Sequence, residues 1–295
     1  MMDVVMASCR LCGSNALAIL ETIDAEKLKA CYGFDTTRFF PNSTVELLAC
    51  LDCGLRTFDR AIPGDSGFYD QLQSIPKYYE GDKAEFEHAL ATIAVIKPTS
   101  VLDVGAGCGL FLRKLLRVPG LRVSASELSE RSLNALRTVG IGIDQVSDKY
   151  DFVCSFQVFE HVSDLRSMMA FVDSKLLPGG TLLVSVPNPE SPLFRDAFCY
   201  LDYPPHHMNR FTKKGLESLG HLKNYVCVDY WREGLRIEHF ATAVNGRRKK
   251  LLAAERFPRL KARLASLFDI VLLPALHDPG NGIGHSHTMV YRKPV

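Results

Sequence analysis

The stretch that decides the fold is Val101-Leu-Asp-Val-Gly-Ala-Gly-Cys-Gly-Leu-Phe-Leu112. Its first residues are typical of a buried strand, and Gly105, Gly107 and Gly109 follow before a helical pattern begins. Glycines at these positions let the backbone come close to a ligand at the carboxyl end of the strand. The stretch therefore predicts an open αβ sheet with a ligand-binding loop after its first strand.

Two nucleotide chemistries use such a loop. A dinucleotide fold needs Gly-x-Gly-x-x-Gly, whose third glycine would fall at position 110, but residue 110 is leucine. Asp103 places a carboxylate beside the loop, where it would repel a pyrophosphate but can serve an ammonium group. The next acid at a strand end is Glu127, where a carboxylate can accept hydrogen bonds from both ribose hydroxyls. The pattern thus disfavours a nicotinamide dehydrogenase.

From about residue 99, short apolar runs alternate with helical stretches, which indicates a mainly parallel sheet covered by helices. We expect seven strands, over residues 100–104, 122–127, 141–144, 151–155, 181–186, 225–230 and 288–292.

The glycine loop with its two acids resembles the cofactor signature of the class I S-adenosylmethionine-dependent methyltransferases, and the resemblance covers about residues 69–292. Two further motifs fall in that family's order. Tyr150–Val162 looks like its fourth strand and active-site turn, and Leu176–Gly180 looks like the turn that enters its fifth strand. The resemblance implies an α/β fold, a Rossmann-like seven-stranded methyltransferase sheet with helices on both faces.

The resemblance also implies the cofactor site. Gly105 and Gly107 would line the methionine moiety of S-adenosylmethionine, Glu127 would hold the ribose, and Leu128 would lie against the adenine. Gln157 would face the cofactor or make a structural polar contact, and Tyr79 would wall the pocket or pack elsewhere. The full predicted cofactor set is Asp103, Gly105, Ala106, Gly107, Glu127, Leu128, Phe156, Gln157 and Tyr79.

Four of the nine cysteines form two knuckles, Cys9-Arg-Leu-Cys12-Gly13 and Cys50-Leu-Asp-Cys53-Gly54. This spacing lets two thiolates hold one zinc ion, and two knuckles make a closed, structural site of four thiolates. The alternative is two unrelated pairs of buried thiols. The 37 intervening residues indicate an inserted helix near residues 25–32.

These features predict three units. Residues 1–66 form a zinc-binding module, residues 67–98 a helical bridge, and residues 99–295 the methyltransferase domain, with a basic amphipathic helical insertion at about 245–273. With Tyr203–Thr212, the module resembles a subgroup of bacterial methyltransferases of sugar and natural-product assembly. Longer members carry an extra C-terminal domain that this chain is too short to hold, which weakens the transfer of their substrates.

His161 is the predicted catalytic base, because it follows a strand end and an imidazole suits proton removal near neutral pH. Glu160 would orient it or act beside it. The alternative is that both residues cap the next helix and shape the cofactor pocket.

His206, His207 and Arg210 are the predicted substrate residues, in a proline-rich loop that would cover the acceptor. Arg210 could pair with a phosphate or a carboxylate. A metal at His206 and His207 is not expected, since adjacent side chains diverge and no nearby acid completes a site.

Composition sets the remaining expectations. The net charge of +2 argues against coating of nucleic acid, and the odd number of cysteines suits a reducing, cytoplasmic location. Residues 247–263 nevertheless hold eight basic residues and one acid, a charge of +7. We expect a lid helix there that packs on the domain. The more specific alternative is that residues 247–272 contact a membrane surface peripherally or bind an acidic partner.

The sequence therefore predicts a methyltransferase acting on an oxygen, nitrogen or carbon nucleophile of a small metabolite, such as a sugar or natural-product intermediate. The alternatives are a nucleic-acid methyltransferase that binds through the zinc module, and a non-catalytic S-adenosylmethionine-binding protein. The sequence leaves the oligomeric state open.

Overall fold

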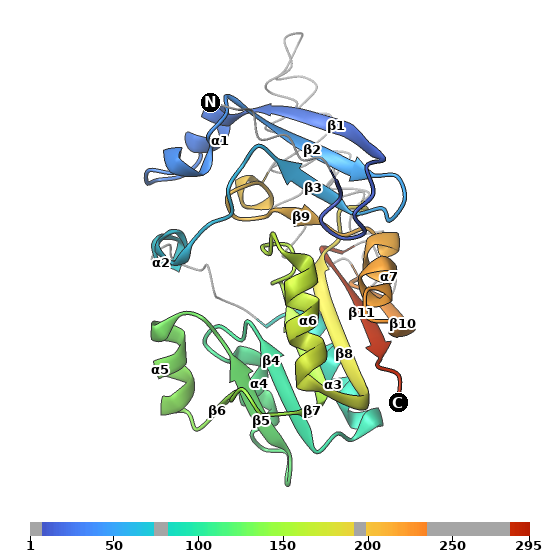
Figure 1. The fold of residues 1–295 in the computed structure, drawn as a ribbon. Coiled ribbons are helices and arrows are strands. Elements are labelled where there is room, and N and C mark those ends of the chain that lie inside the picture. Colours follow the sequence, from blue (N-terminus) through green and yellow to red (C-terminus); the bar gives the residue numbers. More distant parts are fainter. Residues whose placement is uncertain (1–7, 74–81, 192–198, 235–283) are drawn as a thin grey trace, which may run out of the picture.

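The computed structural model describes residues 8–73, 82–191, 199–234 and 284–295. Within these ranges the chain forms a large sheet flanked by helices and a small sheet that lies across one end of it (Figure 1). Tyr79 and the basic insertion at 245–273 lie outside the described residues. Among the described helices, none has the length and apolar character needed to cross a membrane.

The large sheet has the strand order β10-β11-β8-β7-β4-β5-β6. Six of its strands run in the same direction, and β11 runs opposite to them, pairing antiparallel with both β8 and β10. The strands are β4 (Ser100–Val104), β5 (Arg122–Ser126), β6 (Gly142–Ile143), β7 (Tyr150–Phe156), β8 (Leu176–Pro187), β10 (Val226–Arg232) and β11 (Ser286–Arg292). All seven predicted strands are present, so the expected fold class is confirmed.

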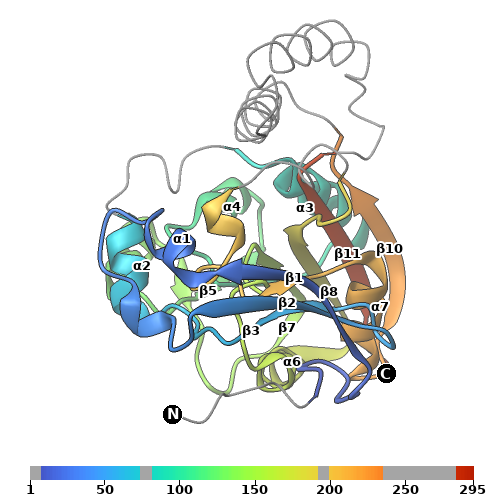
Figure 2. The same cartoon turned by 90° about the horizontal axis from the view of Figure 1, so that it is seen from above.

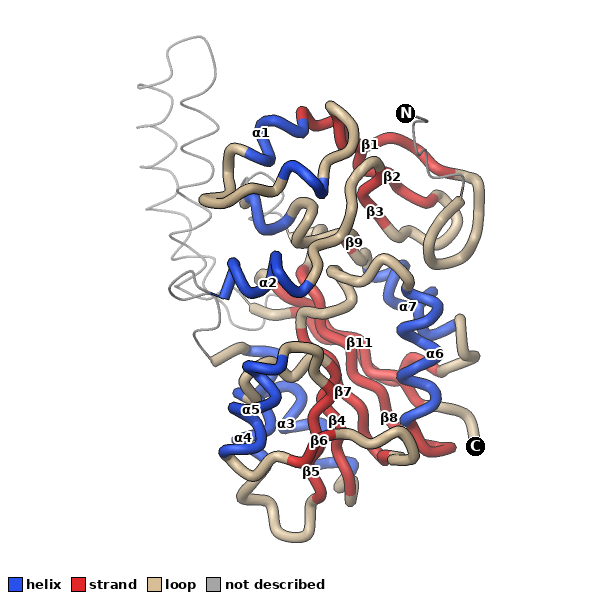
Figure 3. Tube along the Cα trace, turned by 60° about the vertical axis from the view of Figure 1, so that its left-hand side comes forward, coloured by secondary structure: helices blue, strands red, loops and turns tan. Residues whose placement is uncertain are grey.

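Helices cover both faces of this sheet (Figure 3). One face buries apolar side chains of α3 (Ala84–Ile96), α4 (Leu110–Leu115) and α5 (Glu130–Thr138). The opposite face buries those of α6 (Leu165–Lys175) and α7 (Lys213–His221). Because every residue of β4 is buried between these layers, its carboxyl end has a fixed position from which the glycine loop emerges.

Side-chain caps fix where three of these helices begin. Ser129, Asp164 and Thr212 accept hydrogen bonds from the backbone N–H groups of Ser132, Ser167 and Gly215, at the starts of α5, α6 and α7. Capping residues of this kind satisfy N–H groups that the first helical turn leaves without partners.

The small sheet has the order β1-β2-β3-β9 and is antiparallel throughout. Three strands come from the N-terminal segment: β1 (Leu17–Asp24), β2 (Thr44–Cys50) and β3 (Arg56–Asp59). The fourth, β9 (Asn209–Arg210), belongs to the segment assigned to the methyltransferase domain. Seen from above, the sheet crosses over the large one (Figure 2). The predicted module at 1–66 is therefore not a self-contained sheet.

The remaining short elements surround the small sheet. They are α1 (Ala25–Lys29), α2 (Ser66–Gln73) and the 3₁₀ helices η1 (Thr37–Phe39) and η2 (Tyr200–Asp202). Helix α1 lies where the sequence indicated an insertion between the cysteine knuckles. An aromatic-rich core that includes Phe58, Phe68 and Tyr203 joins α2 and the 200–203 segment to this sheet.

Candidate active site

The glycine loop leaves β4 at its carboxyl end and turns into α4. Gly105, Gly107 and Gly109 have φ values of 77°, 54° and 78°, a region that other residues rarely adopt. A Cβ atom on Gly105 would lie 2.4 Å from Cγ2 of Val158, so glycine is also required by space. The loop thus packs directly against the turn after β7 that carries Glu160 and His161.

Glu127 closes the other side of this loop, just after β5. Its Oε2 atom accepts a hydrogen bond from the Gly107 N–H at 2.8 Å, and Oε1 accepts from the N–H groups of Leu128 at 2.7 Å and Ser129 at 2.9 Å. The predicted ribose ligand therefore lies beside the glycine loop, at the carboxyl ends of neighbouring parallel strands where ligands bind in open αβ sheets.

Asp103 is buried in β4 below the loop, with 3% of its surface exposed. Its Oδ1 atom has no hydrogen-bond partner among the described residues, and burial raises its pKa to about 7. A buried carboxyl without a partner is costly unless a donor or a cation approaches it. This orphaned oxygen fits the ammonium group of S-adenosylmethionine, beside a glycine loop that could line the methionine moiety and a Glu127 that could hold the ribose.

The other predicted cofactor residues have varied surroundings. Leu128 is 99% exposed beside Glu127, whereas Phe156 packs in the core against Phe86 and Phe111. Gln157 donates through Nε2 to Glu85 at 3.1 Å and to Ser286 at 3.3 Å, the structural polar contact that we gave as its alternative. Ala106 lies in the glycine loop, and the cofactor role of all these residues stays a prediction.

The turn after β7 is tied to the loop that precedes β9. The backbone carbonyl of Glu160 accepts from the N–H groups of Met208 at 2.7 Å and Asn209 at 2.9 Å. Asn209 also donates through Nδ2 to the Val162 carbonyl at 2.6 Å and accepts at Oδ1 from the Thr57 hydroxyl at 3.1 Å. Residues from β3, the β7 turn and the 203–210 loop are thereby held in one place.

His161, His206 and His207 meet at this junction. The carbonyl oxygens of His206 and Leu201 can only accept, so His161 and His206 each donate to them through Nδ1–H, both at 2.7 Å. This tautomer leaves Nε2 of His161 with its lone pair.

One expectation about these histidines was wrong. The His206 and His207 rings do not diverge but stack, with centroids 4.5 Å apart and an interplanar angle of 19°. One ring nitrogen from each of the three histidines lies within 4.8 Å of the others, a spacing that could hold a metal ion. The loop fold brings the adjacent rings together, because both backbone N–H groups bond the Tyr203 carbonyl.

Glu160 and His161 form a close pair of titratable side chains. The Glu160 side chain is 1% exposed, and neither carboxyl oxygen has a hydrogen-bond partner within the described ranges. Burial raises the pKa of Glu160 to about 8 and lowers the pKa of His161 to about 4, so both favour their neutral forms at pH 7. Nε2 of His161 lies 3.9 Å from Oε1 of Glu160, and an imidazolium there would stabilise the ionised carboxylate.

Arg210, the third predicted substrate residue, is held on aromatic faces. Its guanidinium carbon lies 4.7 Å from the Tyr203 ring centroid and 5.0 Å from that of Phe58, and Nη2 donates to the Asp202 carbonyl at 3.2 Å. It lines a small cavity with His207 and Arg56. Sequence reasoning missed Arg56, because only the pairing of β3 with β9 brings it here.

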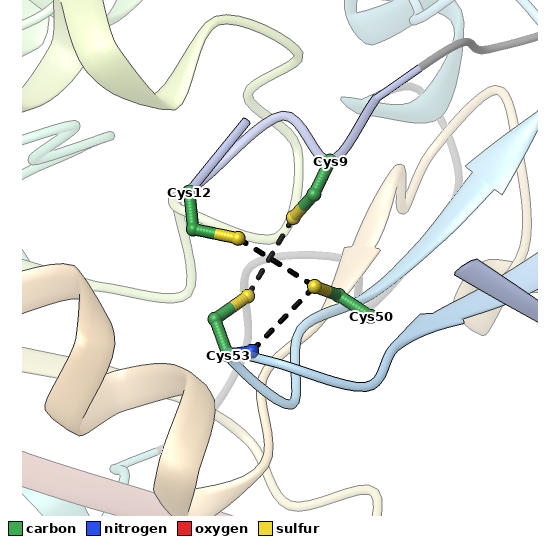
Figure 4. Close-up of side chains that lie close together, drawn as sticks. All are labelled: Cys9, Cys12, Cys50 and Cys53. Atoms are coloured by element: carbon green, nitrogen blue, oxygen red, sulfur yellow. Dashed lines mark hydrogen bonds between the residues drawn. The ribbon is translucent and has the colours of Figure 1, made fainter. Parts of the chain in front are cut away.

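The four cysteines of the predicted zinc site come together (Figure 4). Sulfur atoms of Cys9 and Cys53 lie 3.5 Å apart, as do those of Cys12 and Cys50. All four Sγ atoms lie within 4.8 Å of one another, near the spacing of about 3.8 Å expected for thiolates 2.3 Å from a tetrahedral zinc. The cluster fits that ion and rests on α7, where Ser218 donates to the Cys53 carbonyl.

Comparison with known proteins agrees with this geometry. Residues 78–230, just over half of the chain, match a family model described as a methyltransferase domain. The chain belongs to this methyltransferase family. With its sheet and glycine loop, it is a class I S-adenosylmethionine-dependent methyltransferase.

Curated relatives of this methyltransferase include two ubiquinone biosynthesis O-methyltransferases. The Erwinia tasmaniensis protein is 29% identical over 45% of the chain and 61% of its own length. The Klebsiella pneumoniae protein is 32% identical over 30% of the chain and 42% of its own length. The chain thus spans only about half the length of these relatives.

Solved structures with a similar fold include an S-adenosylmethionine-dependent methyltransferase from Archaeoglobus fulgidus. It is 16% identical, covers 78% of the chain and 100% of its own, and has a TM-score of 0.45.

Proposed function

We propose that this methyltransferase transfers a methyl group from S-adenosylmethionine to a nucleophile of a small metabolite, such as a sugar or natural-product intermediate, in the cytoplasm. The relatives named as O-methyltransferases favour oxygen as the nucleophile. The observation that carries the proposal is the contact of Gly105 with Val158, three residues before His161, because it puts the cofactor loop beside the histidine cluster.

Bound S-adenosylmethionine would supply an activated methyl group for in-line displacement. The glycine loop, Glu127 and Asp103 would bind and orient it, and the fixed junction of β3, the β7 turn and the 203–210 loop would position the acceptor. A hydroxyl acceptor must also lose a proton, and the Nε2 lone pair of His161 can take it.

Glu160 would assist this proton transfer. In the fraction of the enzyme that already holds Glu160 ionised, its carboxylate, 3.9 Å from Nε2, would stabilise the imidazolium that His161 forms when it takes the acceptor's proton, and no proton leaves Glu160 in this step. The assignment of His161 as base and Glu160 as its partner is part of the proposal.

We further propose that Cys9, Cys12, Cys50 and Cys53 hold a structural zinc ion. A site with four thiolates has no open position for a substrate, so its effect would be to fix the end of β2 and the start of β3. That would in turn hold Thr57 against Asn209 at the junction that would position the acceptor.

The test is a methyl-transfer assay with S-adenosylmethionine and a panel of hydroxylated and carboxylated metabolites, with release of S-adenosylhomocysteine as the readout. Turnover on a member of the panel that is lost in His161→Ala supports the proposal. Binding of S-adenosylmethionine without turnover on any acceptor would favour a non-catalytic binding protein instead.

A further inference from the structure

Two arginines face each other across the pairing of β3 with β9. Arg56 and Arg210 are direct partners in this antiparallel register, next to Thr57 and Asn209. Directly opposite residues in such a pair point to the same side with Cβ atoms about 5 Å apart, and like charges there are destabilising. The Arg210 charge accordingly lowers the pKa of Arg56, in addition to the larger effect of burial.

The two arginines line the same cavity, of about 100 Å³. Asn188, His207 and His285 add side chains that can donate hydrogen bonds to its lining. Asp202 is the single acid of the lining, and its carboxylate lies 3.6 Å from Nδ1 of His207. The cavity therefore has two cations against one acid, with Glu190 as a further acid whose charge acts on Arg56.

The two guanidinium groups differ in what holds them. Arg210 is fixed by the Phe58 and Tyr203 rings and by the Asp202 carbonyl. Arg56 makes no ion pair or side-chain hydrogen bond with the residues that the structure describes. A half-buried guanidinium with unused N–H donors beside a second cation is the arrangement that binds carboxylate and phosphate oxygens.

The cavity adjoins the proposed base. His207 belongs both to its lining and to the histidine cluster, and its ring centroid lies 4.8 Å from that of His161. An acceptor with an anionic group held between the arginines could therefore extend past His207 to His161.

We propose that Arg56 and Arg210 form an anion subsite that binds a carboxylate or phosphate group of the methyl acceptor. The N-terminal module then has a second role, because through Arg56 it supplies half of this subsite. The identification of the ligand as the methyl acceptor rests on the proposed function. The binding of an anion at this place does not rest on it.

The experiment measures binding of inorganic phosphate and of acetate to the full chain by calorimetry, in the wild type and in Arg56→Gln. The matched control is Arg38→Gln, which removes an exposed arginine of the same module. Loss of a charge-assisted bidentate contact should weaken anion binding by about tenfold or more in Arg56→Gln, and Arg38→Gln should match the wild type. Arg56→Lys keeps the charge but loses the planar fork, so it should bind with intermediate affinity.

Preference for phosphate over acetate would indicate a phosphorylated acceptor, and the reverse a carboxylated one. If neither anion binds the wild type, or if Arg38→Gln weakens binding as much as Arg56→Gln, the subsite is wrong. Binding of S-adenosylmethionine to the same samples separates the two proposals. A wild type that does not bind S-adenosylmethionine would contradict the proposed function, whatever the anion result. Binding of S-adenosylmethionine by Arg56→Gln shows that this variant is folded.

Discussion

The glycine loop and the histidine cluster lie against each other, yet they are built in different ways. The predicted cofactor residues Asp103, Gly105 and Glu127 come from one continuous β4-α4-β5 unit. The proposed acceptor face joins Arg56 on β3, the turn after β7 and the loop before β9, which are far apart in the chain. The first region depends on local backbone geometry and the second on packing between two sheets, so changes can damage one and spare the other.

Removal of the proposed zinc ion should have the largest effect on stability and turnover, and it should act on the proposed acceptor face. Structural zinc contributes about 10 kcal/mol or more in isolated zinc fingers, so loss of the ion from the four-cysteine cluster should unfold the ends of β2 and β3. Chelation, or the variant Cys50→Ser, should lower the melting temperature and abolish turnover. Metal analysis, thermal melting and the methyl-transfer assay measure these effects, and calorimetric titration of S-adenosylmethionine shows whether cofactor binding survives.

The matched control is Cys31→Ser, which changes a cysteine outside the cluster. A zinc-free wild type with unchanged melting temperature would show that the cysteines are only packed thiols.

Asp103 offers a test of the cofactor region through the pH dependence of stability. Its pKa rises from 3.8 to about 7 on folding, so its protonated form is favoured. Stability from this group is full below pH 3.8 and is lost as the pH rises through 7. Asp103→Asn mimics the neutral acid and does not titrate. The change that it makes in the free energy of unfolding of the ligand-free protein should therefore be more stabilising at pH 8 than at pH 4, by up to about 4 kcal/mol.

Urea unfolding of both proteins at the two pH values measures this difference. An equal effect of the substitution at both values would mean that Asp103 ionises normally in the folded protein.

His161→Ala should separate the two regions by function. Loss of the base should reduce turnover by about a hundredfold, whereas affinity for S-adenosylmethionine should change by no more than about twofold. Steady-state rates and calorimetry measure the two quantities. His221→Ala, at the exposed end of α7, is the control and should keep normal rates. Near-normal turnover in His161→Ala would remove it from the base role.

Sequence reasoning recovered the large sheet and the glycine loop because their signals are local. Apolar runs bounded by turn residues identified all seven strands, and the spacing from Asp103 to Glu127 follows from one βαβ unit. The pairing of β9 with β3 could not be read in this way, since a two-residue strand has no periodicity. The approach of Arg56 to Arg210 and the stacking of His206 on His207 both depend on how β9 and the loop before it are placed, so neither was predicted from the sequence.

The smallest effect should come from the link between the module and the acceptor face. Thr57→Val removes the hydroxyl that donates to Asn209 at 3.1 Å, and a buried hydrogen bond of this kind contributes about 1 kcal/mol. Turnover should fall by a few fold, with cofactor affinity unchanged. Thr22→Val, at an exposed position of β1, should change neither quantity. A weakened cofactor affinity in Thr57→Val would mean that the two regions are not separable.

The central claim is that a local cradle of the glycine loop and Glu127 binds S-adenosylmethionine independently of the acceptor face. Calorimetric titration of S-adenosylmethionine into the wild type, Glu127→Ala and His161→Ala tests it most directly. We predict one binding site in the wild type, affinity at least about tenfold weaker in Glu127→Ala, and wild-type affinity in His161→Ala. Equal affinity in the wild type and Glu127→Ala, or no binding to the wild type, would contradict the account.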